Sequence, residues 1–319
     1  MLSAARRVTP LARLAGRAER PAPAIDWTTP IDRSRQFICE TLTPLAYTAV
    51  YQELAPHHRL RYNQLTGMVA SELILLLETE CLTATLDAVH DAADDDLRAA
   101  VGQFAADERR HADIWRRLSR LSEPGWYVDT DHVLCRPTPG LRGLARLLAA
   151  RPLWWPVVFW VQLAQEERSI DISRRSLRLP ADRLEPRYAA AYREHLRDEV
   201  RHVQIDCHLI ERFYATRSPA VRRISAAIFR RLIGGVFLRP MRSTVRVAGV
   251  LAAEYPELVP LLPRIRRELA ALADNDAYHR MMYSREGTPI TFAWFDRFEE
   301  FRSLGRVLRA YDPPSRRSR

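Results

Sequence analysis

The chain has 319 residues, 47% of them hydrophobic, and a formal net charge of +10. This is enough apolar material for one large domain, or for one domain with an appendage. Every basic residue apart from histidine is an arginine, which we attribute to the codon bias of a GC-rich genome rather than to selection at one site. The arginines are spread along helix faces among acids, and no nucleic-acid motif accompanies them. The charge therefore indicates a solvated surface, and we expect no nucleic-acid partner.

The composition favours helix over sheet, because glycine is scarce while alanine, leucine, arginine and glutamate are abundant. No apolar run reaches the length of a transmembrane helix, so we expect no membrane partner. Four cysteines without paired spacing give neither a zinc knuckle nor a disulfide framework: Cys39, Cys81, Cys135 and Cys207. These features predict an all-α protein of a reducing, bacterial cytoplasm.

Four segments are expected along the chain. Residues 1–24 are rich in arginine and alanine and lack an apolar signal core, so we predict a disordered tail. Residues 25–216 would form a helical bundle, with a lead-in of one or two short helices. Residues 217–311 continue as helices that flank the bundle or form a homodimer contact. Residues 312–319 would be a second disordered tail.

The bundle is predicted from apolar periodicity and from helix start signals. Its four long helices are expected at about 57–90, 95–121, 156–175 and 187–216. An acidic turn, Asp91–Asp96, suits the start of the second helix, and Pro156 suits the first turn of the third. Residues 122–152, with several prolines and glycines, are predicted to be a linker between the two helix pairs. Further helices are expected at 220–238, after Pro240, at 263–280 and at 291–311.

The most informative stretch lies on the fourth predicted helix, where His195, Glu199 and His202 follow one another at i, i+4 and i+7. With about 100° per residue, the three side chains fall within about 60° of each other. Two imidazoles and a carboxylate on one face can hold a metal ion. The second helix repeats the pattern, with Glu108 and His111 at i and i+3.

A single Glu-x-x-His is usually a solvated helix face, but here each copy also has a glutamate on the preceding helix. Glu78 stands upstream of the first copy and Glu167 upstream of the second, each at the distance of a helical hairpin. Two Glu-x-x-His helices and two Glu helices form the two-metal site of a four-helix bundle. Glu166 adjoins Glu167, and spacing alone leaves it open as the ligand.

The predicted ligand set is rich in carboxylates. It comprises Glu78, Glu108, His111, Glu167, Glu199 and His202, with His195 as a seventh member. Four carboxylates balance the charge of two Fe(II) ions, whereas zinc prefers thiolate or more imidazole. Asp107 and Asp198, one turn before the histidines, would accept the second ring N–H, unless they are ordinary surface acids.

Other polar residues near these positions are not expected to be ligands. Glu72 and Glu80 point away from the direction of Glu78 on an ideal helix, and one or both would face solvent or an arginine. His208 lies off the face of the site and is expected to pack.

The segment from His195 to His202 resembles the ligand helix of the p-aminobenzoate N-oxygenase family of di-iron proteins. That family has a third histidine four residues before the glutamate of the second motif, which His195 matches. Glu167, followed by Ile170 and Asp171, is similar to the third-helix segment of the family, and this favours Glu167 over Glu166. The resemblance covers roughly residues 57–216.

The resemblance implies a ferritin-like bundle with two non-haem iron ions and O2 as co-substrate. Such an enzyme would form a peroxo species and convert an amine to hydroxylamine and nitro products. Electrons would come from a separate ferredoxin or reductase, because no flavin or nicotinamide motif is visible. Two alternatives remain: a di-iron hydroxylase or desaturase acting on carbon of a hydrophobic substrate, and a ferroxidase or iron-binding protein. Trp154, Trp155, Phe159 and Trp160 would line a channel in the first alternative, although packing is the more ordinary role for them.

Overall fold

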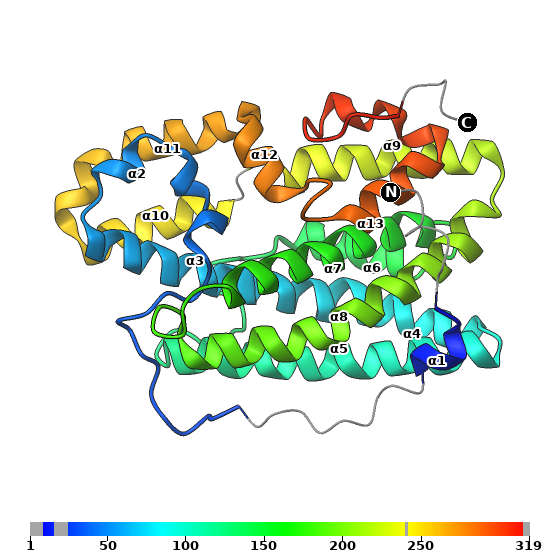
Figure 1. The fold of residues 1–319 in the computed structure, drawn as a ribbon, viewed down its shortest axis with the longest axis horizontal. Helices are drawn as coiled ribbons and strands as arrows, with labels where there is room; N and C mark the ends of the chain where they lie inside the picture. The colour runs from blue at the N-terminus through cyan, green and yellow to red at the C-terminus, as the bar shows by residue number, and fades with distance from the viewer. Residues whose placement is uncertain (1–8, 16–24, 240–241, 315–319) are drawn as a thin grey trace.

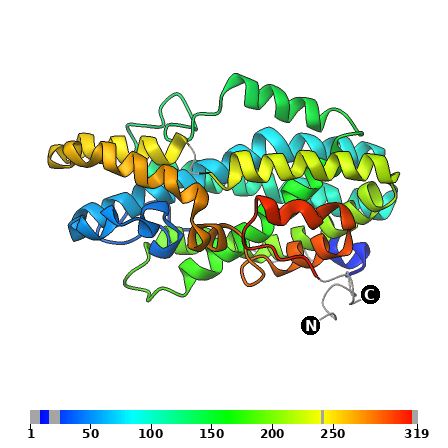
Figure 2. The same ribbon diagram turned by 90° about the horizontal axis from the view of Figure 1, so that it is seen from above.

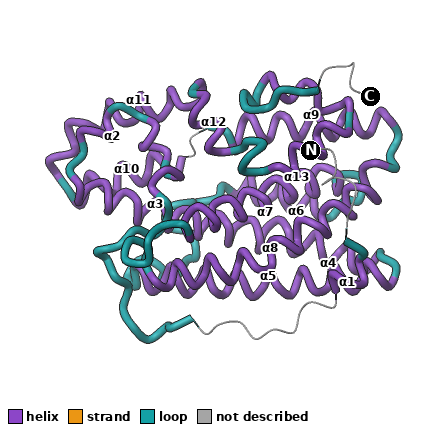
Figure 3. Tube along the Cα trace, in the orientation of Figure 1, coloured by secondary structure: helices purple, strands orange, loops and turns teal. Residues whose placement is uncertain are grey.

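The computed structural model describes residues 9–15, 25–239 and 242–314. Four long helices lie side by side (Figure 1): α3 (Pro56–Leu77), α5 (Asp95–Ser122), α7 (Trp155–Leu177) and α8 (Pro186–Ile210). No strand occurs in these described ranges, where loops join helix to helix (Figure 3). The all-α, ferritin-like bundle is thus confirmed, and none of its described helices is both long and apolar enough to span a bilayer.

The first predicted helix is continuous but changes its geometry in the middle. α3 passes into a π-helical turn, η4 (Glu78–Leu82), and then into α4 (Thr83–Ala92). The hydroxyl of Thr83 donates to the Glu78 carbonyl within this turn. A π-helical turn holds one extra residue in the helix and thereby re-aims the side chains around it. It begins at Glu78, the residue predicted to be a ligand.

The interior of the bundle contains two apolar clusters. On α5 one cluster takes residues 97–105 and the other residues 112–118, and on α8 they take residues 203–210 and 188–192. The buried polar residues between them on these two helices include the predicted metal-ligand motifs. The polar layer therefore crosses the bundle between two hydrophobic blocks.

The segment between the hairpins is more ordered than a plain linker, because it contains α6 (Pro139–Ala149). Glu80 pairs with this helix: its carboxylate lies 3.1 Å from Arg142 and 3.6 Å from Arg146. The prediction that Glu80 faces solvent or an arginine therefore agrees with the structure. The prediction of an unstructured linker missed α6, whose start at Pro139 is itself a favoured first-turn position.

Glu72 has a different role from the one expected. Its buried carboxylate accepts hydrogen bonds from the Tyr127 hydroxyl at 2.6 Å and from the backbone N–H groups of Val133, Leu134 and Cys135. A carboxylate that is removed from water needs such donors. Glu72 thus ties the segment that follows α5 back onto α3.

Residues near the N-terminus also depart from the prediction of a disordered tail. Residues 11–15 form α1 (Leu11–Ala15), and Leu14 is buried in the core. The Nε2 atom of His208 lies 2.8 Å from the carbonyl oxygen of Thr9, so His208 packs as expected. The rest of the predicted tail, and residues 315–319 at the other end, lie outside the described residues.

The lead-in consists of short helical turns: η2 (Glu40–Leu42), η3 (Pro44–Tyr47) and α2 (Val50–Glu53). Phe37, just before them, packs on α3 at Gly67. A Cβ atom at Gly67 would lie 2.6 Å from the Cβ of Phe37, so only glycine permits this approach.

The C-terminal helices lie partly along the α7 side of the bundle, opposite α5, and partly over α3 and the lead-in (Figures 1 and 2). They are α9 (Pro219–Leu232), η6 (Ile233–Phe237), α10 (Arg242–Glu254), η7 (Pro256–Leu261), α11 (Leu262–Ala271), η8 (Leu272–Asp274), α12 (Asp276–Met282), α13 (Pro289–Arg297) and η9 (Glu299–Arg306). The helices expected at 263–280 and 291–311 are interrupted, at Asn275 and at Phe298, where the backbone is extended. Trp160 of α7 packs against Phe229, Phe295 and Phe301 of this region, so it is a core residue.

Candidate metal centre

Six of the seven predicted ligands meet in the polar layer. Ligand atoms of Glu108, His111, Glu199 and His202 all lie within 4.8 Å of one another, and those of Glu78, His111 and His195 form a second such group. All six side chains are at least 96% buried. His111 belongs to both groups, so the two sets of atoms are contiguous.

The two motif histidines present the same ring nitrogen to the carboxylates. The Nδ1 atom of His202 lies 3.1 Å from Glu108 and 3.3 Å from Glu199. The Nδ1 atom of His111 lies 3.6 Å from each of these glutamates. His195 uses its other nitrogen: its Nε2 atom lies 3.0 Å from Glu199 and 3.2 Å from Glu78.

Many polar atoms of this cluster have no hydrogen-bond partner. Both carboxylate oxygens of Glu108 and of Glu199, one oxygen of Glu78, and the Nδ1 atoms of His111 and His202 are buried without a hydrogen-bond partner. Burying so many polar atoms without partners is costly. Divalent cations would satisfy them, because carboxylate oxygen and neutral imidazole nitrogen are the donor atoms that iron accepts. The residues present therefore fit a pair of metal ions.

Glu167 is the predicted ligand that the structure does not bring to the cluster. Its two carboxylate oxygens accept hydrogen bonds of 2.7 Å from the backbone N–H groups of Ile290 and Thr291, at the start of α13. Glu166 is the glutamate of α7 that faces the cluster, with its Oε2 atom 3.6 Å from the Nδ1 atom of His202. Adjacent helical residues point about 100° apart, so only one of the two can face inward.

The position of Glu167 has its own physical explanation. The first N–H groups of a helix lack intrahelical partners and attract negative charge. Burial raises the pKa of Glu167 to about 7, although its hydrogen bonds to Ile290 and Thr291 act in the opposite direction. Glu167 therefore attaches the C-terminal region to the bundle, a contact that could not be read from the pattern around α7 alone.

Asp107 and Asp198 do contact the second ring nitrogens, but each contacts the histidine of the other helix. Asp198 of α8 lies 3.2 Å from the Nε2 atom of His111 on α5. Asp107 of α5 lies 3.4 Å from the Nε2 atom of His202 on α8. An acceptor at Nε2 favours the tautomer that carries hydrogen there, which leaves Nδ1 free for a metal.

Two arginines complete this arrangement, and the sequence analysis missed them. Arg110 donates to Asp107 at 3.1 Å and also to Asp198. Arg201 donates to Asp107 and lies 3.4 Å from Asp198. The signal was present, since Asp107 and Asp198 both begin the pattern Asp-Glu-x-Arg-His. The repeat thus includes the arginine that neutralises the aspartates of both helices.

The three glutamates of the cluster differ in the direction of their pKa shifts. Burial, and then the charges of Glu108 and Glu199, raise the pKa of Glu78 well above its usual range. Burial also raises the pKa of Glu199. Burial acts in the same direction on Glu108, but the neighbouring imidazoles of His111 and His202 outweigh it and lower the pKa of Glu108. Clustered acids that cannot all ionise without cations have this signature.

A cavity of about 180 Å³ adjoins the cluster, and Glu78, Glu166 and His195 form part of its wall. Most of the remaining wall is apolar and comes from α3, the lead-in, α7 and the C-terminal region, including Ile38, Leu73, Ile172 and Phe237. The guanidinium of Arg168 also lines it, held at 2.9 Å from Asp171. The cluster therefore faces a mostly apolar space.

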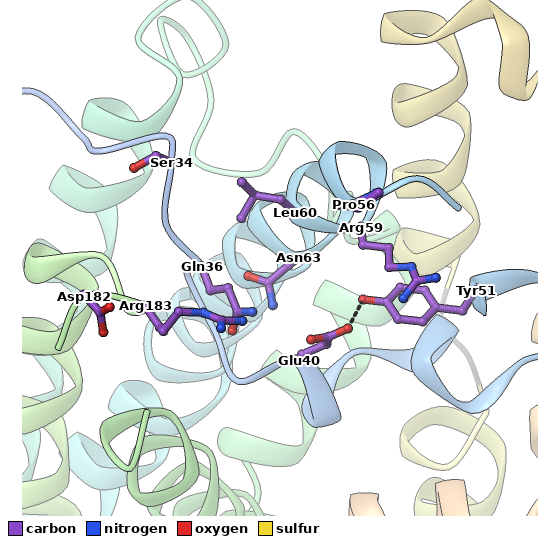
Figure 4. Close-up of a pocket in the computed structure, with 10 residues that line it drawn as sticks. All are labelled: Ser34, Gln36, Glu40, Tyr51, Pro56, Arg59, Leu60, Asn63, Asp182 and Arg183. Atoms are coloured by element: carbon purple, nitrogen blue, oxygen red, sulfur yellow. Dashed lines mark hydrogen bonds between the residues drawn. The ribbon is translucent and has the colours of Figure 1, made fainter. Parts of the chain in front are cut away.

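A second cavity, of about 310 Å³, lies near the lead-in and shares no residue with the cluster (Figure 4). Its wall is largely polar, and the Tyr51 hydroxyl donates to Glu40 across it at 2.7 Å. Its size exceeds that of the first cavity, but no ligand-type cluster opens into it. The smaller cavity is therefore the candidate substrate site.

The fold and the cluster define a ferritin-like bundle with a buried carboxylate–histidine centre. The model of the p-aminobenzoate N-oxygenase AurF family matches residues 6–253, and the chain belongs to this family. The match extends on both sides of the 57–216 segment that carried the resemblance. No individual curated protein matches the chain. The family is one of oxygenases. Membership in it, together with the buried cluster, favours a metal-dependent enzyme that acts on a small molecule.

Proposed function

We propose that the protein is an O2-dependent di-iron oxygenase that oxidises the nitrogen of an amine to hydroxylamine and nitro products. The observation that carries this proposal is the set of buried, unpartnered carboxylate and imidazole atoms beside an apolar cavity. The metal would be held by Glu78, Glu108, His111, Glu166, His195, Glu199 and His202. When bound, two iron ions would supply the activation of O2.

The residues of the chain have separate roles around that chemistry. Asp198 and Asp107 hold the rings of His111 and His202 so that each Nδ1 atom faces inward. The apolar wall excludes water and fits the hydrocarbon part of a substrate. Because Glu78, Glu166 and His195 form the end of that cavity, a substrate in it would place one group against the cluster.

The source of electrons is part of the proposal. Conversion of an amine to a hydroxylamine inserts one oxygen atom of O2 and reduces the other to water, which takes two electrons and two protons from outside the amine. We propose an external donor, a ferredoxin or a reductase.

The decisive experiment combines metal analysis with product analysis. Protein expressed with ample iron should contain about two iron atoms per chain, and the reduced protein should consume O2 with a panel of arylamines and release hydroxylamine and nitro compounds. Tight binding of zinc with iron content near zero would contradict the di-iron assignment. Because the cavity is apolar, the panel should include hydrophobic amines with oxidisable carbon. If the products are oxidised only at carbon, the enzyme is a hydroxylase and not an N-oxygenase. Rapid Fe(II) oxidation without any organic product would favour a ferroxidase.

A further inference from the structure

The outer side of the bundle between α5 and α8 carries a layered arrangement of charge. We call this surface the α5–α8 seam and define it by its five arginines: Arg110, Arg117, Arg193, Arg197 and Arg201. Beneath them, the side chains of Asp107, Glu194 and Asp198 are only 1%, 1% and 4% exposed. Five cations and three carboxylates give 5 − 3 = +2; Arg201 is buried with the carboxylates, and the other four arginines lie outside them.

Helix geometry places four of these arginines, all except the buried Arg201, together on the outside. Arg193 and Arg197 lie on the side of α8 that faces away from His202, by the 100° rule. Arg117 follows Arg110 by two turns on α5, so both lie on one side of that helix. The side chains of Arg110 and Arg197 are 38% and 35% exposed, and Arg117 and Arg193 are exposed residues.

The seam is also the surface with a direct hydrogen-bonded connection to the metal-binding nitrogens. Arg110 donates to Asp198, and Asp198 contacts the Nε2 atom of His111, whose Nδ1 atom faces the cluster. Arg201, Asp107 and His202 form the matching connection from the other helix. One carboxylate and one imidazole therefore separate the surface from the cluster.

Other sides of the cluster are used differently. The cavity is lined mainly by apolar residues of α3, α7, the lead-in and the C-terminal region, which suits a substrate. The C-terminal helices cover the α7 side, whereas α5 lies on the opposite side of the bundle (Figure 1). Substrate and electrons could thus reach the cluster from different directions.

We propose that the α5–α8 seam is the docking surface for an acidic one-electron donor protein of the ferredoxin class. Electrons would enter through the Asp198–His111 and Asp107–His202 pairs. This inference rests on the proposed function, because it assumes iron in the cluster. Each transfer oxidises one reduced iron–sulfur cluster by one electron and reduces one Fe(III) to Fe(II), so two donor molecules reduce a loaded site.

The chemistry of the seam fits such a partner. Complementary charge accelerates encounter and makes it dependent on salt concentration, while electron-transfer contacts are small. Val200, 47% exposed between Arg197 and Arg201 on α8, offers an apolar contact on this surface. The buried aspartates limit the total charge, which suits a transient complex.

The test compares two double variants of the full chain with equal charge change. The seam variant carries Arg117→Glu and Arg193→Glu. The control carries Arg223→Glu and Arg231→Glu, two exposed arginines of α9 on the other side of the bundle. Neither pair touches the cluster, and Arg117→Gln with Arg193→Gln serves as a milder version should the seam variant fold poorly.

The probe is a plant-type [2Fe–2S] ferredoxin. We expect the seam variant to weaken ferredoxin binding by about tenfold at low salt, and to slow reduction of the ferric protein similarly, with less salt dependence. The control should change both by less than twofold, and dithionite should reduce all variants at the parent rate. Equal losses in the control, or an unchanged seam variant, would overturn the docking surface.

Titration of ferredoxin against the iron-free chain separates this inference from the proposed function. A seam-specific loss of binding there supports the docking surface even if oxygenase activity is absent. Conversely, arylamine oxidation with dithionite together with binding that is indifferent to the seam would retain the enzyme and reject the surface.

Discussion

Asp198 and His111 are on different helices, yet the Asp198 carboxylate lies 3.2 Å from the outer ring nitrogen of His111. Asp107 contacts His202 in the same crossed manner. Each Glu-x-x-His helix therefore supplies side chains to the buried cluster and an acceptor that orients the histidine of its partner helix.

The crossed contact predicts the effect of Asp198→Asn. An amide at this position no longer balances the charge of Arg110, and it does not fix the tautomer of His111. We expect iron affinity to fall by about 10- to 100-fold, as measured by competition with a chelator. Asp113→Asn is the control, because Asp113 is a 69% exposed acid of α5, the helix that carries His111, and it pairs with Arg116. Equal affinities of Asp198→Asn and parent would mean that the contact does not orient the ring.

Adjacent glutamates on α7 give the sharpest test of the ligand set. Glu166→Ala should lower the iron content, because it removes the carboxylate that faces His202. Glu167→Ala should keep the iron but leave the N–H groups of Ile290 and Thr291 without acceptors, at a cost of about 1–3 kcal/mol in unfolding free energy. Iron analysis and urea unfolding of both variants decide this, and the reverse pattern would restore Glu167 as the ligand.

The pH dependence of the iron-free protein follows from the pKa values of the cluster. Burial raises the pKa of Glu78, so the folded chain keeps a proton that the unfolded chain releases above about pH 4.5. Burial lowers the pKa of His202, but the charge of Glu199 and the hydrogen bond to Asp107 raise it well above normal. The stability that the charged imidazole contributes is lost as pH rises through this raised pKa. Both effects make the iron-free protein less stable at alkaline than at mildly acidic pH.

Metal binding should reverse that trend, because cations replace the protons. We therefore expect Fe(II) to raise the melting temperature, with a larger increase at pH 8 than at pH 6. Thermal melts at the two pH values, with and without Fe(II) under anaerobic conditions, provide the measurement. Identical midpoints with and without metal would show that the cluster does not bind iron.

His195 distinguishes this centre from a bundle with only two histidines. His195→Ala removes a neutral donor, so part of the iron should remain, whereas Glu199→Ala should remove most of it. The optical spectrum after mixing the reduced protein with O2 should change, and arylamine turnover should be lost. His208→Ala, on the same helix, is the control because His208 contacts Thr9 and not the cluster. An unchanged spectrum and turnover would make His195 an ordinary core residue.

The sequence was sufficient for the bundle and for six residues of the cluster, because helical spacing alone determines which side chains share a face. It was insufficient where a partner comes from a distant segment. Glu167 could be separated from Glu166 only by the N–H groups of α13. Glu72 was expected to face solvent or an arginine, because its hydrogen-bond donors, Val133 to Cys135, lie beyond the next helix in the sequence. The crossed pairing of Asp107 and Asp198 likewise depends on how α5 and α8 pack together.

The hydrogen bonds of Glu72 have a consequence for how the cluster is enclosed. All of its partners, up to Cys135, precede α7, which begins at Trp155. The contact that ties α3 to the segment after α5 therefore needs no residue of the second hairpin. Glu78, Glu108 and His111 all lie within the stretch that this contact closes, so the half of the cluster on α3 and α5 is enclosed by residues of the first hairpin and the segment after it.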